Sequence, residues 1–180
     1  MRDMELRGRT ATGFSLIELM VVLAIAGIIA MVAIPAYQRS VQKNNRAVAK
    51  ARIAQAAQLL ERFYSDNNSY FVIKNTGSCA LATGTTAANA DGFMKLMNPA
   101  WNCAAPNTVY SGSNNEATSV YTITLLSDST TGPNAFTLTA TPRTGTSQAG
   151  DFCGNLTLTN TGVKGFVPPS GSSAQLTDCW

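Results

Sequence analysis

The chain has 180 residues and a formal net charge of +3, and only 13% of its residues are charged. This length fits one domain plus a membrane segment. There is no histidine, the commonest general base and metal ligand, and no nucleophile elbow, phosphate-binding loop or pair of neighbouring carboxylates replaces it. We therefore expect a protein that is not an enzyme, with no cofactor and no metal. So low a charge fraction suits a surface that packs against copies of the chain or related chains.

An apolar run begins near the N-terminus. Every one of residues 19–34 is Ala, Val, Ile, Leu, Met or Gly, and the next charge is Arg39. As a helix, residues 19–37 would span about 28 Å, the thickness of a bilayer core. Glu18 is the only charge between residues 10 and 38. Because a carboxylate in a membrane costs at least about 2–3 kcal/mol, Glu18 is a candidate functional residue that needs a cationic partner.

The composition changes sharply before this run, at the junction of Gly13 and Phe14, whereas a secretory signal is cleaved after its apolar region. Gly13 is followed by Phe-Ser-Leu-Ile-Glu-Leu at residues 14–19. This motif resembles the processing site of type IV prepilins, the class III signal, at every position. The resemblance implies that residues 1–13 are a leader peptide. It also implies that a prepilin peptidase cleaves after Gly13 and methylates the new amino terminus at Phe14.

The same residues predict how the chain would assemble. After cleavage, the α-amine of Phe14 lies one helical turn from Glu18 and on the same face. A buried carboxylate needs such a cation, and the amine of the same or of an adjacent subunit can supply it. The resemblance implies the pair between subunits, which sets the axial register of a filament. It also implies assembly roles for Gly27 and Pro35, since a proline here accompanies local unwinding in the fibre; a tolerated membrane kink is the alternative.

We expect one long helix over residues 14–66, with a transmembrane and polymerisation half, 14–37, and an amphipathic half, 38–66. One apolar stripe of the second half has helical spacing and should carry a head domain: Ala49, Ile53, Ala56, Ala57, Leu60, Phe63 and Tyr64. Basic residues occupy much of the remaining surface: Arg39, Lys43, Arg46, Lys50, Arg52 and Arg62. They could contact anionic lipid or DNA. A solvated face or a contact between subunits is the favoured interpretation.

The head is expected over residues 67–180. Its first part, residues 72–119, is rich in Gly, Asn, Thr and Ala and is predicted to be an irregular loop, which at this length needs a cross-link. A sheet is expected within residues 120–160, because apolar residues alternate with threonine there. Its antiparallel strands are predicted at residues 121–125, 136–141 and 156–159, with a candidate fourth at 163–167.

All four cysteines lie in the head. An even number of cysteines in an exported domain indicates disulfides, and the spacings match no zinc motif. Three pairings are compatible with four cysteines. Nearest-neighbour pairing, Cys79–Cys103 and Cys153–Cys179, fits the predicted strands best. Each bridge would then stabilise the head by about 3 kcal/mol, and the second would bound a C-terminal region of residues 153–179.

Two further segments, residues 60–70 and the C-terminal region, resemble the PilE-like minor type IV pilins. The resemblance implies the type IV pilin fold, an α+β fold in which a long N-terminal helix packs on an antiparallel sheet of three to four strands. It implies a single-pass protein of the bacterial inner membrane with its head in the periplasm, and later a surface pilus fibre. The implied partners are other pilin subunits, the prepilin peptidase and the inner-membrane assembly platform. Lys/Arg counts alone do not orient the chain, but the cysteines favour an exported head.

The leading hypothesis is a minor pilin of a type IV pilus, with twitching motility, adhesion or DNA uptake as consequences that the resemblance implies. The alternative is a pseudopilin of a type II secretion system. Pseudopilins resemble this chain in their N-terminal chemistry, but heads of the major type usually bind calcium and lack disulfides. This chain has four cysteines, and its tail has only Asp151 and Asp178 as carboxylates. DNA binding is not favoured, because four basic and five acidic side chains from residue 67 onward give the head a net charge of −1.

Overall fold

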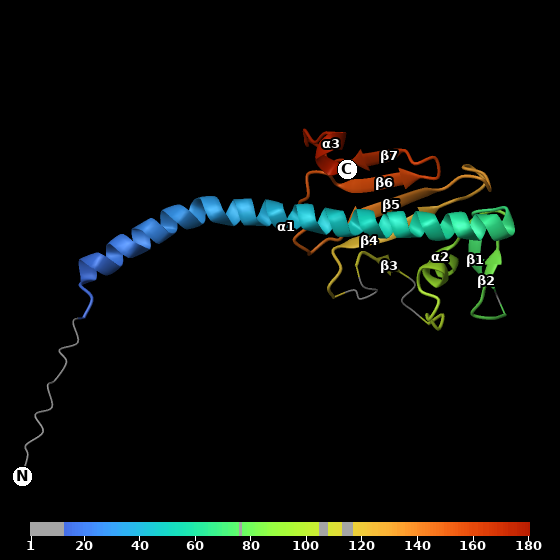
Figure 1. Ribbon diagram of the computed structural model, residues 1–180, viewed down its shortest axis with the longest axis horizontal. Helices are drawn as coiled ribbons and strands as arrows, with labels where there is room; N and C mark the ends of the chain where they lie inside the picture. Colours follow the sequence, from blue (N-terminus) through green and yellow to red (C-terminus); the bar gives the residue numbers. More distant parts are fainter. Residues whose placement is uncertain (1–12, 76, 105–107, 113–116) are drawn as a thin grey trace, which may run out of the picture. The chain divides into compact units, whose positions relative to one another are not determined.

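The computed structural model describes residues 13–75, 77–104, 108–112 and 117–180. The predicted leader up to residue 12 therefore lies outside the described residues. The chain forms two compact units, Met1–Ser40 and Val41–Trp180. The first element, α1 (Leu16–Asn67), belongs to both units (Figure 1). It begins two residues later than predicted and ends one residue later.

In the first unit, α1 is an exposed apolar helix. Ser15 Oγ accepts a hydrogen bond from the backbone N–H of Glu18 at 3.3 Å, which caps the first turn. Glu18 itself lies in that turn, where the helix dipole favours a negative charge. Pro35 lies inside the helix without ending it. Within the described part of the chain, α1 is the single helix whose length and composition would allow it to cross a membrane.

In the second unit, one face of α1 is buried in the core of the head. The buried residues are Arg46, Ala49, Ile53, Ala56, Leu60 and Phe63, and Ala57 and Tyr64 pack against them partly buried. The predicted apolar stripe is thus in the core. The prediction that Arg46 lies on the basic surface of the helix is wrong, because this residue is only 5% exposed. The helix ends where Asn68 adopts a left-handed conformation, φ 53°, which asparagine tolerates better than most residues.

The head contains a five-stranded antiparallel meander in the order β3-β4-β5-β6-β7. Its strands are β3 (Val109–Tyr110), β4 (Tyr121–Leu126), β5 (Thr137–Pro142), β6 (Asn155–Thr159) and β7 (Lys164–Val167). The register pairs Ile123 with Ala140 and Ala140 with Leu156, so that apolar side chains share one buried face. The candidate fourth strand is present as β7. The two-residue β3 was not predicted, so the sheet has five strands rather than three to four.

The prediction of an irregular loop over residues 72–119 is wrong for much of its described part. A two-stranded sheet pairs β1 (Val72–Lys74) with β2 (Leu81–Thr83), and α2 (Ala90–Met97) follows. Strands of three residues are too short to show a period of two, and α2 has only eight residues, fewer than a helix needs to be recognised from its period. The side chain of Asn89 caps α2 by accepting a hydrogen bond from the Gly92 N–H at 2.7 Å.

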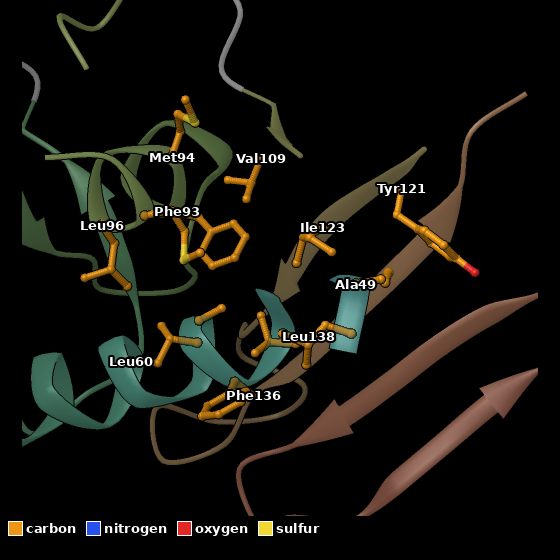
Figure 2. Packing of buried hydrophobic residues seen from close by; sticks show 14 of the residues in the cluster. Ala49, Leu60, Phe93, Met94, Leu96, Val109, Tyr121, Ile123, Phe136 and Leu138 are labelled. Carbon is orange, nitrogen blue, oxygen red and sulfur yellow. The ribbon is translucent and has the colours of Figure 1, made fainter. Parts of the chain in front are cut away.

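One hydrophobic core joins α1, α2 and the sheet within the second unit. Figure 2 shows Phe93 of α2 directed toward Val109 and Ile123 of the sheet, and it shows Leu60 of α1 and Leu138 of β5 in the same core. All five side chains are at most 3% exposed. The core fixes the sheet and the surrounding loops against the second half of α1.

Two disulfides cross-link the head. Cys79 and Cys103 are joined with a Cα–Cα distance of 5.8 Å, and Cys153 and Cys179 with one of 5.7 Å. The second bridge ties the loop before β6 to the last helix, α3 (Leu176–Cys179). These are the nearest-neighbour pairs along the chain.

Candidate functional site

The predicted processing and assembly residues lie at the start of α1. Gly13 precedes the helix and is exposed, as is Phe14, which is 80% exposed. Glu18 is also exposed and has no ion-pair partner among the described residues of its own chain. The exposed peptide bond between Gly13 and Phe14 is accessible to a peptidase. The carboxylate of Glu18 is free to form an ion pair with a cation of another subunit. In the structure Gly13 and Phe14 precede α1, which begins at Leu16, and Glu18 lies in its first turn.

The first unit also presents a long apolar surface. Large side chains that are exposed there include Leu16, Ile17, Leu19, Met20, Leu23, Ile28, Met31 and Val32. A soluble monomer rarely exposes a contiguous apolar patch of more than a few hundred square ångströms. This segment therefore needs lipid or other apolar helices around it.

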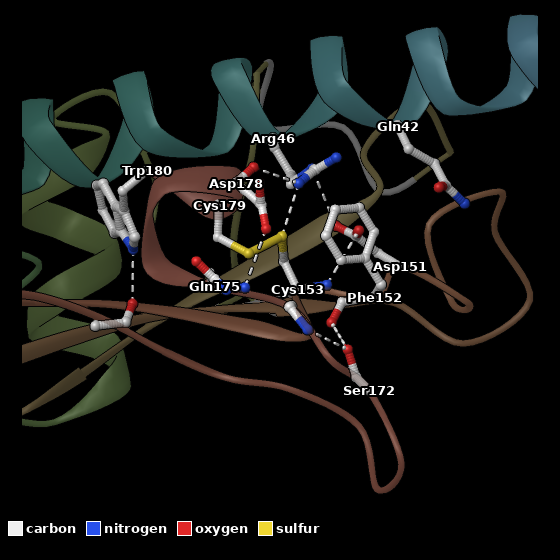
Figure 3. Close-up of a disulfide and its surroundings, with 12 residues drawn as sticks. Gln42, Arg46, Asp151, Phe152, Cys153, Ser172, Gln175, Asp178, Cys179 and Trp180 are labelled. Atoms are coloured by element: carbon white, nitrogen blue, oxygen red, sulfur yellow. Dashed lines mark hydrogen bonds and ion pairs between the residues drawn. A yellow bond between two sulfur atoms is a disulfide. The ribbon is translucent and has the colours of Figure 1, made fainter.

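In the second unit, a buried ion pair attaches the C-terminal region to α1 (Figure 3). Arg46 Nε lies 3.5 Å from Asp151 Oδ2, and both side chains are almost completely buried. Arg46 Nη1 donates hydrogen bonds to the carbonyl oxygen of Asp178 at 3.0 Å and to Cys153 Sγ at 2.6 Å. The ring of Phe152 lies 4.7 Å from the guanidinium carbon. One arginine therefore contacts both ends of the Cys153–Cys179 region.

Asp151 extends this contact into a network. Its Oδ2 accepts hydrogen bonds from the Tyr121 hydroxyl at 2.7 Å and from Gln148 Nε2 at 2.6 Å. Asn45 of α1 donates to Gln148 Oε1 at 3.1 Å. Burial, together with the hydrogen bond to Asp151, raises the pKa of Tyr121 well above its usual value. Arg46 Nε makes no hydrogen bond and meets Asp151 only as an ion pair. The other polar groups named here are hydrogen-bonded, so the network can remain buried and fix the C-terminal region to α1 and β4.

Sequence reasoning missed this network, although one signal was present. Arg46 is three residues before Ala49 and seven before Ile53, so it continues the helical spacing of the buried stripe. Asp151 and Asp178 entered the sequence analysis only as carboxylates too few for a calcium site and as charges of the head. In the structure the first pairs with Arg46, and the second caps α3 by accepting a hydrogen bond from the Gln175 N–H at 3.1 Å.

Basic residues of α1 and the head gather around the last residue of the chain. The amine nitrogens of Lys50 and Lys164 lie 5.8 and 5.6 Å from the centre of the Trp180 ring. The indole N–H of Trp180 donates to the Gly165 carbonyl at 2.6 Å, which fixes the ring against β7. The pKa of Lys50 is lowered, first by burial and then by the charges of Arg46, Lys164 and Lys43. We call Lys43, Lys50, Lys164 and Trp180 the basic cluster.

These features define a class of protein. An exposed apolar helix begins at a Gly-Phe processing motif, carries a glutamate in its first turn, and continues into an α+β head with an antiparallel meander. That combination is a type IV pilin. A family described as "Type IV minor pilin ComP, DNA uptake sequence receptor" matches residues 35–157, more than half of the chain. The chain belongs to this family.

The N-terminal part is similar to a second family. The prokaryotic N-terminal methylation motif matches residues 8–34, which include the predicted processing site. Together the two matches confirm the predictions of a prepilin signal, of an α+β pilin and of a type IV pilus subunit, and they do not favour the pseudopilin alternative. The motif and the apolar helix indicate a membrane-anchored pilin.

Two individual proteins are also similar to the chain. The "Type IV wide pilus major component PilA4" of Thermus thermophilus is 42% identical over 62 residues, which are 34% of this chain and 47% of that protein. The chain thus matches about half the length of this curated relative. A solved type IV pilin from Shewanella oneidensis is 22% identical, with a TM-score of 0.37 over 74% of this chain and 99% of that one. We draw nothing from so low a score.

Proposed function

We propose that a prepilin peptidase cleaves this chain after Gly13 and methylates Phe14, and that the chain then enters a type IV pilus as a minor subunit. The observation that carries the proposal is the methylation motif at residues 8–34, joined to an apolar helix whose first half is exposed. In this proposal, residues 14–37 anchor the chain in the inner membrane with the head in the periplasm. The partners are other pilin subunits, the peptidase and the inner-membrane assembly platform.

Glu18 has the central role in assembly. The methylated α-amine of Phe14 in a neighbouring subunit neutralises the carboxylate, which would otherwise be an uncompensated charge among apolar helices. The absence of an ion pair for Glu18 within the described residues of its own chain supports this arrangement. Gly27 and Pro35 allow the helix to adapt inside the fibre, since glycine adds no side chain and proline removes one backbone hydrogen bond.

Mass spectrometry of sheared surface filaments tests this proposal. We expect a methylated peptide that begins at Phe14, present at low abundance beside a second, major pilin. An uncleaved leader would contradict the processing step. A processed chain that is confined to the cell envelope and absent from filaments would contradict the assembly step.

A second proposal is that the chain takes part in DNA uptake, because the family to which it belongs is described as a DNA uptake sequence receptor. The net charge of −1 for the head disfavoured DNA binding, but it was summed only from residue 67 onward and left out the basic residues of α1. In the structure, cations of α1 and of the head lie together in the basic cluster. Transformation frequency in a strain that lacks the chain, with pili still counted on the surface, tests this role. Normal transformation in that strain would contradict it.

A further inference from the structure

We propose that copies of this chain contact one another within the fibre, with Leu176 of one copy seated in an apolar groove on the head of the next copy. The inference rests on the proposed entry into a pilus. It adds a partner, which is a second copy of the chain, and the two surfaces that meet. It implies that this subunit occurs in runs along the fibre rather than singly.

The groove lies between the last turns of α1 and the segment of the head that follows α1. Its apolar lining comes from α1, β2, α2 and the turn after α2, through the side chains of Leu59, Phe63, Leu81, Leu96 and Pro99. Its volume is about 240 Å³, which is below the roughly 300–1,000 Å³ of sites for small molecules. The groove therefore fits a single apolar side chain better than a small-molecule ligand.

A disulfide and a lysine hold two walls of the groove. Cys79 lies two residues before Leu81, which belongs to one wall. Cys103 lies four residues after Pro99, which belongs to the other, and the Cys79–Cys103 bridge ties the two segments together. Lys95 donates a hydrogen bond to the Pro99 carbonyl at 2.6 Å. Because the walls are fixed before a partner arrives, little conformational entropy is lost on binding.

The rim of the groove carries two charged side chains of α1, Arg62 and Asp66. Both are exposed, and neither has a hydrogen bond or an ion pair with any residue that the structure describes. Their spacing of four residues is one at which helical side chains can pair, but no such pair forms between them. A partner that brings an apolar side chain with an anion and a cation beside it would complement the whole rim.

The chain presents such a group on α3. Leu176 is 44% exposed, and we call it the Leu176 knob. Asp178 follows two residues later, is exposed, and uses one carboxylate oxygen to accept a hydrogen bond from the Gln175 N–H. Lys164 is exposed and lies against the ring of Trp180, whose backbone N–H donates to the Leu176 carbonyl. The knob is thus flanked by an anion and by a cation.

The knob and the groove lie at different levels and on different sides of the head. Arg46 donates a hydrogen bond to the Asp178 carbonyl, so α3 lies at the level of Arg46, whereas the groove contains Arg62. Positions 46 and 62 of α1 are separated by about 24 Å along the helix. Figure 1 shows α3 on one side of α1, and α2, β1 and β2 on the other. Two copies with parallel α1 helices, staggered by this distance, would bring knob and groove together.

A contact between two different surfaces of the same molecule does not close on itself when the copies are related by a translation, and it then propagates as a fibre. One side chain in a groove is too small a contact to hold free chains together, since stable interfaces bury about 1,200–2,000 Å² in total. In a fibre the first halves of α1 would already hold the subunits close, which raises the effective concentration of the knob. We therefore expect the contact in filaments and not between free heads.

The experiment replaces Leu176 by the photo-reactive p-benzoyl-L-phenylalanine in the full chain, irradiates sheared filaments, and separates the products on a denaturing gel. Each chain then has one photo-reactive knob and one groove. We expect a ladder of dimers, trimers and larger multimers, with cross-linked peptides from the groove in the dimer band. The control carries the same photo-reactive residue in place of Val163, which is exposed in the turn between β6 and β7, and should give no groove peptides.

Charge exchange at the rim gives a second readout. In the Leu176 photo-reactive chain, R62E should lower the fraction of multimers at least about threefold, because it places two anions together. R62E/D178K should restore that fraction, since the charges are exchanged. Both positions are exposed, and the melting temperature and the two native disulfides check that the variants fold.

The outcomes separate this inference from the proposed function. Monomers only, or cross-links to a different pilin, in filaments that contain the chain would overturn the contact between copies and leave entry into the pilus standing. Multimers that R62E does not reduce would overturn the assignment of the groove. A wild-type chain absent from sheared filaments would overturn the proposed function, and the inference with it.

Discussion

At the scale of single residues, Arg46 determines how the C-terminal region is attached. Its guanidinium group is 107 residues from Cys153 in sequence and yet contacts that sulfur, the Asp178 carbonyl and the Asp151 carboxylate. A pair of opposite charges at such low exposure adds little when it is complete, since its desolvation cost offsets its attraction. Removal of one partner is different, because the other charge then stays buried alone.

Arg46→Ala should therefore lower the free energy of unfolding of the head by about 3–5 kcal/mol. Urea denaturation followed by circular dichroism measures the change. Lys43→Ala, one turn earlier and exposed, is the matched control and should change stability by less than about 0.5 kcal/mol. A loss below about 1 kcal/mol for Arg46→Ala would show that Asp151 finds another partner or water.

Tyr121 makes the stability of the head depend on alkaline pH. Burial, and then the hydrogen bond to Asp151, raises its pKa in the folded chain. Above a pH of about 10 the unfolded chain loses this proton while the folded chain keeps it, so the folded state binds more protons and stability falls as pH rises. The slope contributed by Tyr121 is about 1.4 kcal/mol per pH unit.

Tyr121→Phe should make the fall of the unfolding free energy with rising pH less steep by about 1.4 kcal/mol per pH unit. Free energies of unfolding measured from about pH 9 to pH 11 in both proteins give the difference. Tyr70, whose pKa burial and Glu61 also raise, remains in both and cancels. Parallel curves for the two proteins would mean that Tyr121 ionises as easily in the folded head as in the unfolded chain.

At the scale of elements, the two disulfides close loops of similar length around different parts of the head. Cys79–Cys103 connects the β1–β2 hairpin to the segment after α2, and Cys153–Cys179 connects the loop before β6 to α3. The sequence separations are 24 and 26 residues, so the chain-entropy model gives both about the same stabilisation.

Replacing either pair by serine should thus cost about 3 kcal/mol in unfolding free energy. The local effects should differ, and hydrogen exchange of backbone amides measures them. Loss of Cys153–Cys179 should raise exchange in α3 and β7, and loss of Cys79–Cys103 should raise it in β2 and α2. Uniform exchange changes across the head in both variants would contradict this division.

At the scale of the whole molecule, the role proposed for Glu18 would connect folding to assembly. Its position in the first turn suits a helix N-terminus, so the isolated subunit tolerates it. The cost arises only when apolar helices surround the carboxylate. One residue can therefore leave the fold unchanged and still decide whether subunits join.

Glu18→Ala and Glu18→Gln should leave processing and membrane insertion intact and lower the amount of this chain in sheared filaments by at least about tenfold, since the lost pair exceeds 1.4 kcal/mol. Immunoblots of membrane and filament fractions measure both quantities. Glu61→Gln, at an exposed site in the second half of α1, is the control. Wild-type amounts of Glu18→Ala in filaments would refute the role of the carboxylate.

Features that depend on neighbouring residues could be predicted from the sequence alone. The processing motif at residues 13–19 is contiguous, and the helix and the three main strands follow from periods of 3.6 and 2 that neighbouring positions display. The apolar stripe of α1 was predicted for the same reason. The features that could not be predicted involve residues far apart in sequence or elements too short to show a period.

Arg46 lies at the edge of the stripe and could be solvated or buried. Its burial depends on Asp151, which the sheet and the second disulfide bring to it. The hairpin of β1 and β2 has strands of three residues, and its partners rather than its sequence make it a sheet. The basic cluster likewise joins Lys50 to Lys164 across the fold, so a net charge summed along the head could not reveal it. The local sequence pattern specifies the longer helices and strands, whereas packing between distant segments determines which charged side chains lie together.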